Sequence, residues 1–358
     1  MATLLGRRSS DPVVPPISKY IREAVHAGSW YSSEAPVLCK SLQEWVVLSP
    51  SPLIETLKAG HTETSIEGCI VPHAGYSYCG STGGLSMHGL HARLLAQRVG
   101  AGLSDTSTWI TTIVILHPSH HIGMNGVGLQ QGCAAVATPL GDLRVLQVSD
   151  LEAKFRANGV AVHRLTKDED EAEHSSEMMY PMIKFILNDI DASYPCDASV
   201  PSLAESISIL PIMVGSASHA TEQSVAKVLL DLGIGSHSDR SVFTVVSSDF
   251  CHYGSRFGYT PTPSIDGQPL FQFIQALDEQ GMEAISGGHS AFSDYLKATR
   301  NTICGRHPIG TYLALQELRA AEGETAGVIN WVDYKQSSKA VKKTDSSVSY
   351  AGAIIVRR

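Results

Sequence analysis

Histidines and cysteines that could bind a metal occur in four segments far apart in the chain. A strand followed by small residues projects its next side chain from the end of a sheet, where ligand crevices form in open α/β proteins. Imidazole and thiol groups converging there predict a metal site or a catalytic His/Cys cluster. The segments are IVPHAGYSYC (70–79), VILHPSHH (114–121), VVSSDFCH (245–252) and TICGRHP (302–308).

The histidines after the first two apolar runs are the simplest candidates. His73 precedes Ala74 and Gly75, whose small size would let a ligand approach the imidazole closely. A hydrogen-bonded structural histidine at a strand end is the alternative. Adjacent side chains point in different directions, so at most one of His120 and His121 would bind a given metal. The other could orient a substrate or a ligand.

Asp249 and His252 are three residues apart, and a helical turn beginning at Ser248 would place them on the same side. A carboxylate that is hydrogen-bonded to an imidazole fixes its tautomer and raises its basicity, which suits a general base. An N-capping aspartate beside an incidental histidine explains the same spacing equally well.

Cys304 lies shortly before Pro308, which is suited to the first turn of a helix. The helix N-terminus and Arg306 would lower the pKa of the thiol and favour the thiolate, the form that binds metals or reacts. A buried, inert cysteine is the alternative.

The acidic run Asp168–Glu171, with Glu173, predicts a solvated face before a helix. His174 and Glu177 follow at an i, i+3 spacing that also serves metal sites. A salt-bridged helix start is the favoured interpretation. Tyr78 could line a pocket, although ordinary aromatic packing explains it as well.

Strands and helices alternate over the whole chain, which predicts a single α/β domain with a central mixed sheet flanked by helices. Pro211 interrupts one strand and predicts a bend or an edge position there. Thr221 is the predicted N-cap of one helix and Gly233 its stop. The predicted strands are 66–71, 110–116, 207–214, 242–246, 328–334 and 347–356, and the predicted helices are 151–158, 176–188, 221–232, 270–280, 290–299 and 308–320.

The remaining organisation follows from composition. Three prolines within residues 1–20 predict a disordered tail, which leaves residues 21–358 as the α/β domain. Residues 191–205, rich in Pro, Ser, Ala and Asp, predict a surface loop. The formal net charge of −8 argues against nonspecific nucleic-acid binding, and no apolar run reaches the length of a membrane span. Seven scattered cysteines without a CxxC pair fit a reducing compartment, so we expect a cytoplasmic protein and consider a nuclear location as well.

Nine segments in a fixed order resemble the Memo family, named for mediator of ErbB2-driven cell motility. The resemblance runs from about residue 20 to the carboxyl end. The matching segments are REAVHAGSWY (22–31), PHAGYSYCGS (72–81), PSHH (118–121), TPLGDLR (138–144), DEDE (168–171), EHSSEM (173–178), VVSSDFCHYG (245–254), NTICGRHPIG (301–310) and DSSVSYA (345–351).

The family is similar in fold to class III extradiol dioxygenases, which open catechol rings with non-haem iron. The resemblance implies that His73, His120 and Cys304 bind one copper or iron ion per chain. It also implies that Asp249 and His252 occupy the neighbouring acid and base positions. The thiolate replaces a carboxylate of the dioxygenases. Soft sulfur favours copper(I), whereas imidazole nitrogen accommodates iron or copper.

The resemblance implies a metal-binding redox protein linked to cell motility and the cytoskeleton, in which the metal exchanges electrons with oxygen and His252 moves protons. One alternative is a dioxygenase or oxidase of a small molecule. Another is a module whose pocket binds a phosphotyrosine peptide or a signalling partner, with Arg306 and the histidines holding the anionic group. The predicted pocket residues are Tyr78, His121, His174, Arg306 and His307.

Overall fold

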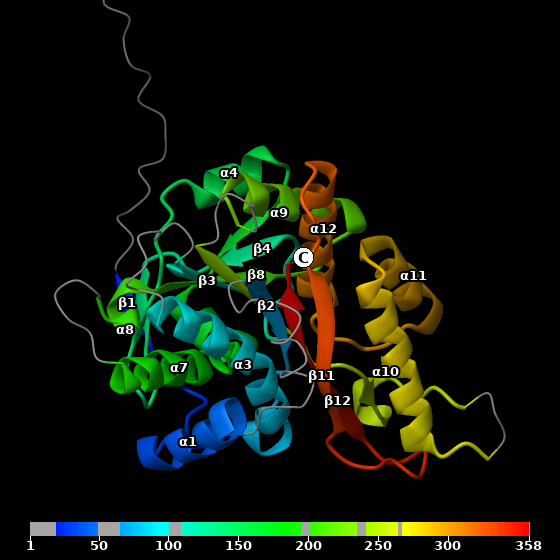
Figure 1. Ribbon diagram of the computed structural model, residues 1–358. Coiled ribbons are helices and arrows are strands. Elements are labelled where there is room, and N and C mark those ends of the chain that lie inside the picture. Colours follow the sequence, from blue (N-terminus) through cyan, green and yellow to red (C-terminus); the bar gives the residue numbers. More distant parts are fainter. Residues whose placement is uncertain are drawn as a thin grey trace, which may run out of the picture.

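The computed structural model describes residues 19–48, 65–99, 109–194, 201–234, 241–263 and 267–357. A nine-stranded mixed sheet runs through the middle of the molecule, and helices cover both of its faces (Figure 1). The predicted α/β class, a single domain with a mixed sheet flanked by helices, is therefore confirmed. The strands of this sheet are β2 (Ile66–Val71), β3 (Thr112–Pro118), β4 (Val127–Leu129), β7 (Val162–Arg164), β8 (Ser208–Val214), β9 (Val242–Ser247), β10 (His252–Tyr253), β11 (Val328–Gln336) and β12 (Ser347–Val356).

Helices make up most of the remaining described structure. A small three-stranded sheet is formed by β1 (Tyr20–Arg22), β5 (Cys133–Val136) and β6 (Leu143–Arg144). The α-helices are α1 (Ala35–Leu42), α3 (Tyr76–Val99), α4 (Leu151–Ala157), α5 (Lys167–Ala172), α6 (His174–Glu177), α7 (Tyr180–Ser193), α8 (Leu203–Ser206), α9 (His219–Asp231), α10 (Leu270–Ser286), α11 (His289–Thr299) and α12 (Arg306–Ala321). A π-helical segment (Gln43–Leu48) follows α1, and a 3₁₀ turn spans Ser255–Phe257.

The central strands are arranged so that their ends meet. The strand order is β10-β12-β2-β9-β3-β8-β4-β7, with β11 paired to β12. Strands β2, β9, β3 and β8 are mutually parallel neighbours, so their carboxyl ends lie along one edge of the sheet. The segments that carry His73, His120 and Asp249 follow β2, β3 and β9 directly. The topology therefore brings three distant segments together.

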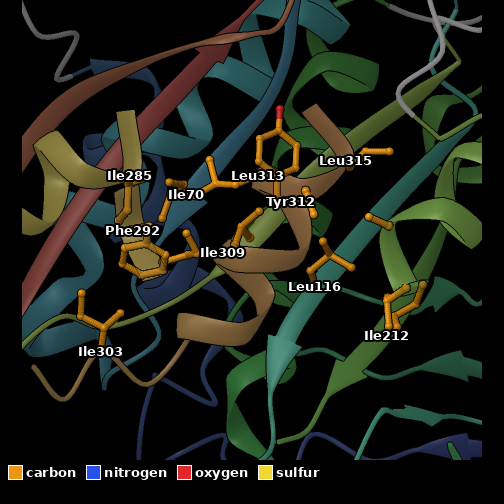
Figure 2. Packing of buried hydrophobic residues seen from close by; sticks show 14 of the residues in the cluster. Ile70, Leu116, Ile212, Ile285, Phe292, Ile303, Ile309, Tyr312, Leu313 and Leu315 are labelled. Carbon is orange, nitrogen blue, oxygen red and sulfur yellow. The ribbon is translucent and has the colours of Figure 1, made fainter. Parts of the chain in front are cut away.

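Side chains alternate between the two faces of these strands, as the period of two requires. On β2, Ile70 packs toward the cluster that contains α9 and α12, whereas Cys69 and Val71 pack toward the cluster that contains α3 and α7. Figure 2 shows part of the first cluster, in which Ile309 of α12 lies near Phe292 of α11. The sheet thus separates two apolar cores.

Most predicted elements are present, with small shifts at their ends. The strand predicted at 110–116 is β3, displaced by two residues, and the helix predicted at 176–188 is divided into α6 and α7. The N-cap of α9 is Ser218 rather than Thr221, because its side chain accepts from the Thr221 amide, while Gly233 follows the helix at φ +78° as predicted. Of the predicted tail, residues 1–18 lie outside the described residues, and Tyr20 begins β1.

Two predictions about local structure were wrong in part. The predicted loop 191–205 contains the end of α7 and most of α8, and residues 195–200 lie outside the described part of the chain. Pro211 lies in β8, which has neighbours on both sides rather than an edge position. This is tolerated because β4 pairs only with Ile212–Val214, so the ladder on that side begins just after the proline.

Helix α3 was not predicted, although it is the longest in the described residues. It is buried on nearly every side, so its sequence has no apolar stripe with a helical period. Its glycines permit close packing instead. A Cβ atom on Gly80 or Gly84 would lie 2.3 or 2.5 Å from the nearest atom of Trp45.

Candidate metal centre

His73 is held in one tautomer at the end of β2. Its Nδ1 lies 2.7 Å from Ser247 Oγ, and that hydroxyl donates to the Ser175 carbonyl at 2.8 Å. Because the hydroxyl has a single proton, it must accept from His73 Nδ1–H. The lone pair is therefore on Nε2, which lies 3.1 Å from Cys304 Sγ.

His120 is fixed in the same way by a buried carboxylate. Its Nδ1 lies 2.8 Å from Glu173 Oε1, and its backbone N–H donates to Glu173 Oε2 at 2.6 Å. Glu173 is fully buried and also accepts the Ser175 amide. An ionised carboxylate only accepts, so His120 Nδ1 donates, and Nε2 is the nitrogen left to bind a metal once its own proton is removed. The His73 and His120 rings lie 5.1 Å apart at 76°.

Cys304 lies beside His73 just before α12. Its sulfur contacts His73 Nε2 and accepts the Asp249 backbone N–H at 3.2 Å. Burial raises the pKa of the Cys304 thiol, and its hydrogen bond with His120 only partly opposes this effect. The predicted lowering of this pKa by the helix start and Arg306 was therefore wrong, because desolvation dominates.

His174, the first residue of α6, brings a third imidazole to the centre. Its ring stacks on His120 with centroids 4.5 Å apart, and one nitrogen each from His73, His120 and His174 lies within 4.8 Å of the other two. Its Nδ1 is buried and has no hydrogen-bond partner among the described residues. The favoured salt-bridged helix start is also present, since Glu177 binds Arg22 at 2.6 Å.

The electrostatics of these groups differ. Burial lowers the pKa of His73 well below its usual value, and burial together with the charge of His120 lowers the pKa of His174 to about 3. Burial opposes protonation of His120 too, but hydrogen bonds to Cys304 and Glu173 raise its pKa to about 10. Despite its burial, Glu173 has a pKa below the usual range because it bonds His120. The removable protons of the cluster are therefore on His120 and Cys304.

Asp249 and His252 lie beside the cluster but do not form the predicted pair. Asp249 Oδ1 accepts the His73 backbone N–H at 2.8 Å, and burial raises the pKa of this carboxyl. His252 Nδ1 lies 2.8 and 3.0 Å from the Phe250 and Thr302 carbonyls, so it donates and Nε2 carries the lone pair. The predicted helical turn was wrong, because this segment leads into β10.

The other predicted pocket residues are spread over a wider region. His121 is exposed at the rim, with its ring 5.9 Å from that of His174. Tyr78, in the first turn of α3, is 59% exposed. Arg306 and His307 begin α12 and line a separate cavity between α9, α11 and α12.

Buried polar residues that the sequence did not indicate hold the centre in place. The guanidinium of Arg22 is fully buried and bonds Glu177, Asp170 and the Glu173 carbonyl. The acidic run is thus not wholly solvated as predicted, because Asp170 is buried against Arg22. The sequence Glu-His-Ser-Ser at 173–176 is the feature that could have indicated that Glu173 contacts the histidine cluster.

The donor atoms suit a transition metal. One nitrogen each from His73, His120 and His174 converges, and Cys304 Sγ lies 3.1 Å from His73 Nε2 at the side of this group. Nitrogen and sulfur donors of this kind accommodate copper or iron, with sulfur favouring copper(I). Among the described helices, none is both long and apolar enough to cross a membrane.

Comparison with known proteins gives a consistent result. Residues 22–354 match the model of a family described as Memo-like protein. Over 338 residues the chain is 35% identical to the protein MEMO1 of Homo sapiens, covering 94% of this chain and 97% of the relative. It is 35% identical to a MEMO1 family protein of Schizosaccharomyces pombe over 94% and 99% of the two chains, and 31% identical to the memo-1 homolog of Caenorhabditis elegans over 94% and 83%.

Proposed function

The chain belongs to the Memo-like protein family, and from that premise we propose that it is a redox protein that binds one copper or iron ion at the strand ends. The ligands are His73, His120 and Cys304. One observation carries the proposal: both histidines donate their Nδ1–H to buried acceptors, which leaves Nε2 of each as the ligand atom, and both imidazoles hydrogen-bond Cys304.

The environment of Cys304 supports a thiolate ligand once a metal is present. The Asp249 backbone N–H donates to the sulfur, and such a contact stabilises negative charge on it. A bound cation would offset the desolvation that raises the thiol pKa, because a coordinating thiol is deprotonated. Binding should therefore release protons from the cluster.

When bound, a copper or iron ion would supply one-electron chemistry toward oxygen. His252 is suited to proton movement, because its Nδ1–H is held by two carbonyls and its Nε2 can accept a proton. Asp249 positions the segment of His73 through that residue's backbone N–H. The exposed His121 at the rim would contact whatever approaches the metal.

His174 supports a second ligand set within the same proposal. Its nitrogen is close enough to bind with His73 and His120, which would give a three-imidazole site. The ligand set with Cys304 and the ligand set with His174 predict different metals, because three imidazoles lack the sulfur that favours copper(I). Cys304→Ala and His174→Ala therefore separate them.

Metal content and affinity of the purified full chain test the proposal. We expect about one copper or iron per chain, a loss of at least tenfold in copper(I) affinity in Cys304→Ala, and a smaller loss in His174→Ala. His121→Ala serves as the matched control, because its ring lies at the rim and should leave affinity unchanged. Wild-type affinity in Cys304→Ala would contradict the thiolate assignment.

The wider role comes from the family resemblance. We include a link to cell motility and cytoskeletal signalling, and a cytoplasmic location, in this proposal. The location is supported by the cysteines, because Cys39, Cys69, Cys79, Cys133, Cys251 and Cys304 are all free thiols. A change in cell migration after deletion, restored by wild type but not by Cys304→Ala, would connect the metal centre to motility.

A further inference from the structure

A second group of histidines lies between α9, α11 and α12. It borders a cavity of about 420 Å³ that Arg306 and His307 also line. His219 and Glu222 are in the first turn of α9 at an i, i+3 spacing, which places both side chains on one side of the helix. His289 is the first residue of α11 and is 1% exposed.

The potential ligand atoms of this group already converge. One atom each from His219, Glu222 and His289 lies within 4.8 Å of the other two. In the metal-free protein His289 Nε2–H donates to Glu222 Oε2 at 2.6 Å, so a metal bound at this nitrogen would displace that proton. The His219 and His289 rings stack with centroids 3.8 Å apart and planes 11° from parallel. Three possible ligand atoms from two helices therefore lie close together.

Contacts from outside the group hold Glu222 and the backbone of His289. His307 Nδ1 lies 2.7 Å from Glu222 Oε1, which leaves Oε2 on the His289 side. Glu317 Oε1 accepts the His289 backbone N–H, and its Oε2 lies 4.0 Å from His289 Nδ1. That buried Nδ1 has no hydrogen-bond partner in the described part of the chain. A shift of Glu317 toward this nitrogen would supply the carboxylate contact that a metal-bound imidazole usually makes.

A purely structural ion-pair cluster explains only part of this arrangement. Glu222 between His289 and His307 is a satisfied carboxylate: burial raises its pKa, but bonds to these two histidines outweigh burial and lower it. This account leaves the buried His289 Nδ1, which has no hydrogen-bond partner among the described residues, without a role. Parallel rings at this separation direct their nitrogen lone pairs along parallel lines, so His219 would turn about its side-chain torsions to bind the same cation as His289.

We propose that His219, Glu222 and His289 form a second metal site, which binds zinc. Two imidazoles and one carboxylate are a common zinc ligand set, and three protein ligands leave a fourth position open. That position would face the cavity, whose lining includes Lys297, Arg300 and Arg306. Water or a small anion would occupy it. The set contains no sulfur, unlike the strand-end centre.

Zinc titration of the full chain tests this site. Because zinc could also occupy the strand-end centre, His120→Ala/Cys304→Ala is the background protein. We expect it to bind about one zinc per chain, with X-ray absorption showing nitrogen and oxygen neighbours only. Adding His219→Ala or Glu222→Gln should weaken that binding at least tenfold. His163→Ala, which removes a histidine that contacts Glu169 elsewhere, is the matched control.

The zinc titration tests the site of His219, Glu222 and His289 independently of the strand-end centre. Unchanged zinc content after His219→Ala, in a protein with a wild-type circular dichroism spectrum, would overturn the proposal. His219 is exposed, so its loss should not impair folding. Failure of the strand-end centre would appear instead as wild-type copper(I) affinity in Cys304→Ala with His219 intact. Either proposal can therefore be contradicted without affecting the other.

Discussion

Replacing Glu173 by glutamine should weaken metal binding although Glu173 would not touch the ion. The carboxylate accepts both the backbone N–H and the Nδ1–H of His120, at 2.6 and 2.8 Å. An amide of the same shape accepts one and turns its NH₂ toward the other donor. Loss of such an outer contact costs about 10- to 100-fold in metal affinity, or about 1.4 to 2.8 kcal/mol.

The pH dependence gives a second, independent signature. The pKa of His120 is raised to about 10, so protons compete with the metal, and affinity should rise with pH up to that value. Without the carboxylate this pKa falls, and affinity should level off at lower pH. The raised pKa also stabilises the metal-free fold below pH about 6.5. That contribution is lost as pH rises toward 10, and less is lost in Glu173→Gln.

Chelator competition with copper(I) across pH 6 to 10 measures both effects, and urea denaturation measures the stability. Glu34→Gln is the control, because Glu34 is exposed and its side chain makes no cap hydrogen bond. Equal affinity and an unshifted pH profile in Glu173→Gln would refute the claim that this carboxylate orients His120.

Two further predictions concern stability, measured as the free energy of unfolding in urea. Arg22→Met should lower it by about 3–5 kcal/mol, because Asp170 would remain buried without its cation; a loss below 1 kcal/mol would mean the network is dispensable. Gly84→Ala should lower it by about 1–3 kcal/mol, since the new Cβ would lie 2.5 Å from Trp45 Cβ. Gly123→Ala, with no atom within 4 Å of the new Cβ, should be neutral. Equal stability of the two glycine variants would contradict the packing argument.

Local patterns predicted the elements that present the strand-end groups. β-Branched runs such as Ile66–Val71 are readable because strand periodicity and turn residues act over a few positions. The same is true of α9, whose apolar residues recur with a helical period, and of the start of α12, which Pro308 marks. Helix α3 was missed because burial on all sides removes that period, and glycine packing against Trp45 depends on a segment distant in sequence.

The sequence by itself determined which residues could do chemistry, because residue type and the turns after strands are local properties. Only the tertiary structure decided how they behave. Ser247 and Glu173 set the tautomers of His73 and His120, and burial raised the thiol pKa that the local sequence predicted to be low. His219 and His289 meet only because α9 and α11 pack near each other. Hydrogen-bond partners, desolvation and the meeting of distant helices are long-range consequences of packing, which no short window of sequence contains.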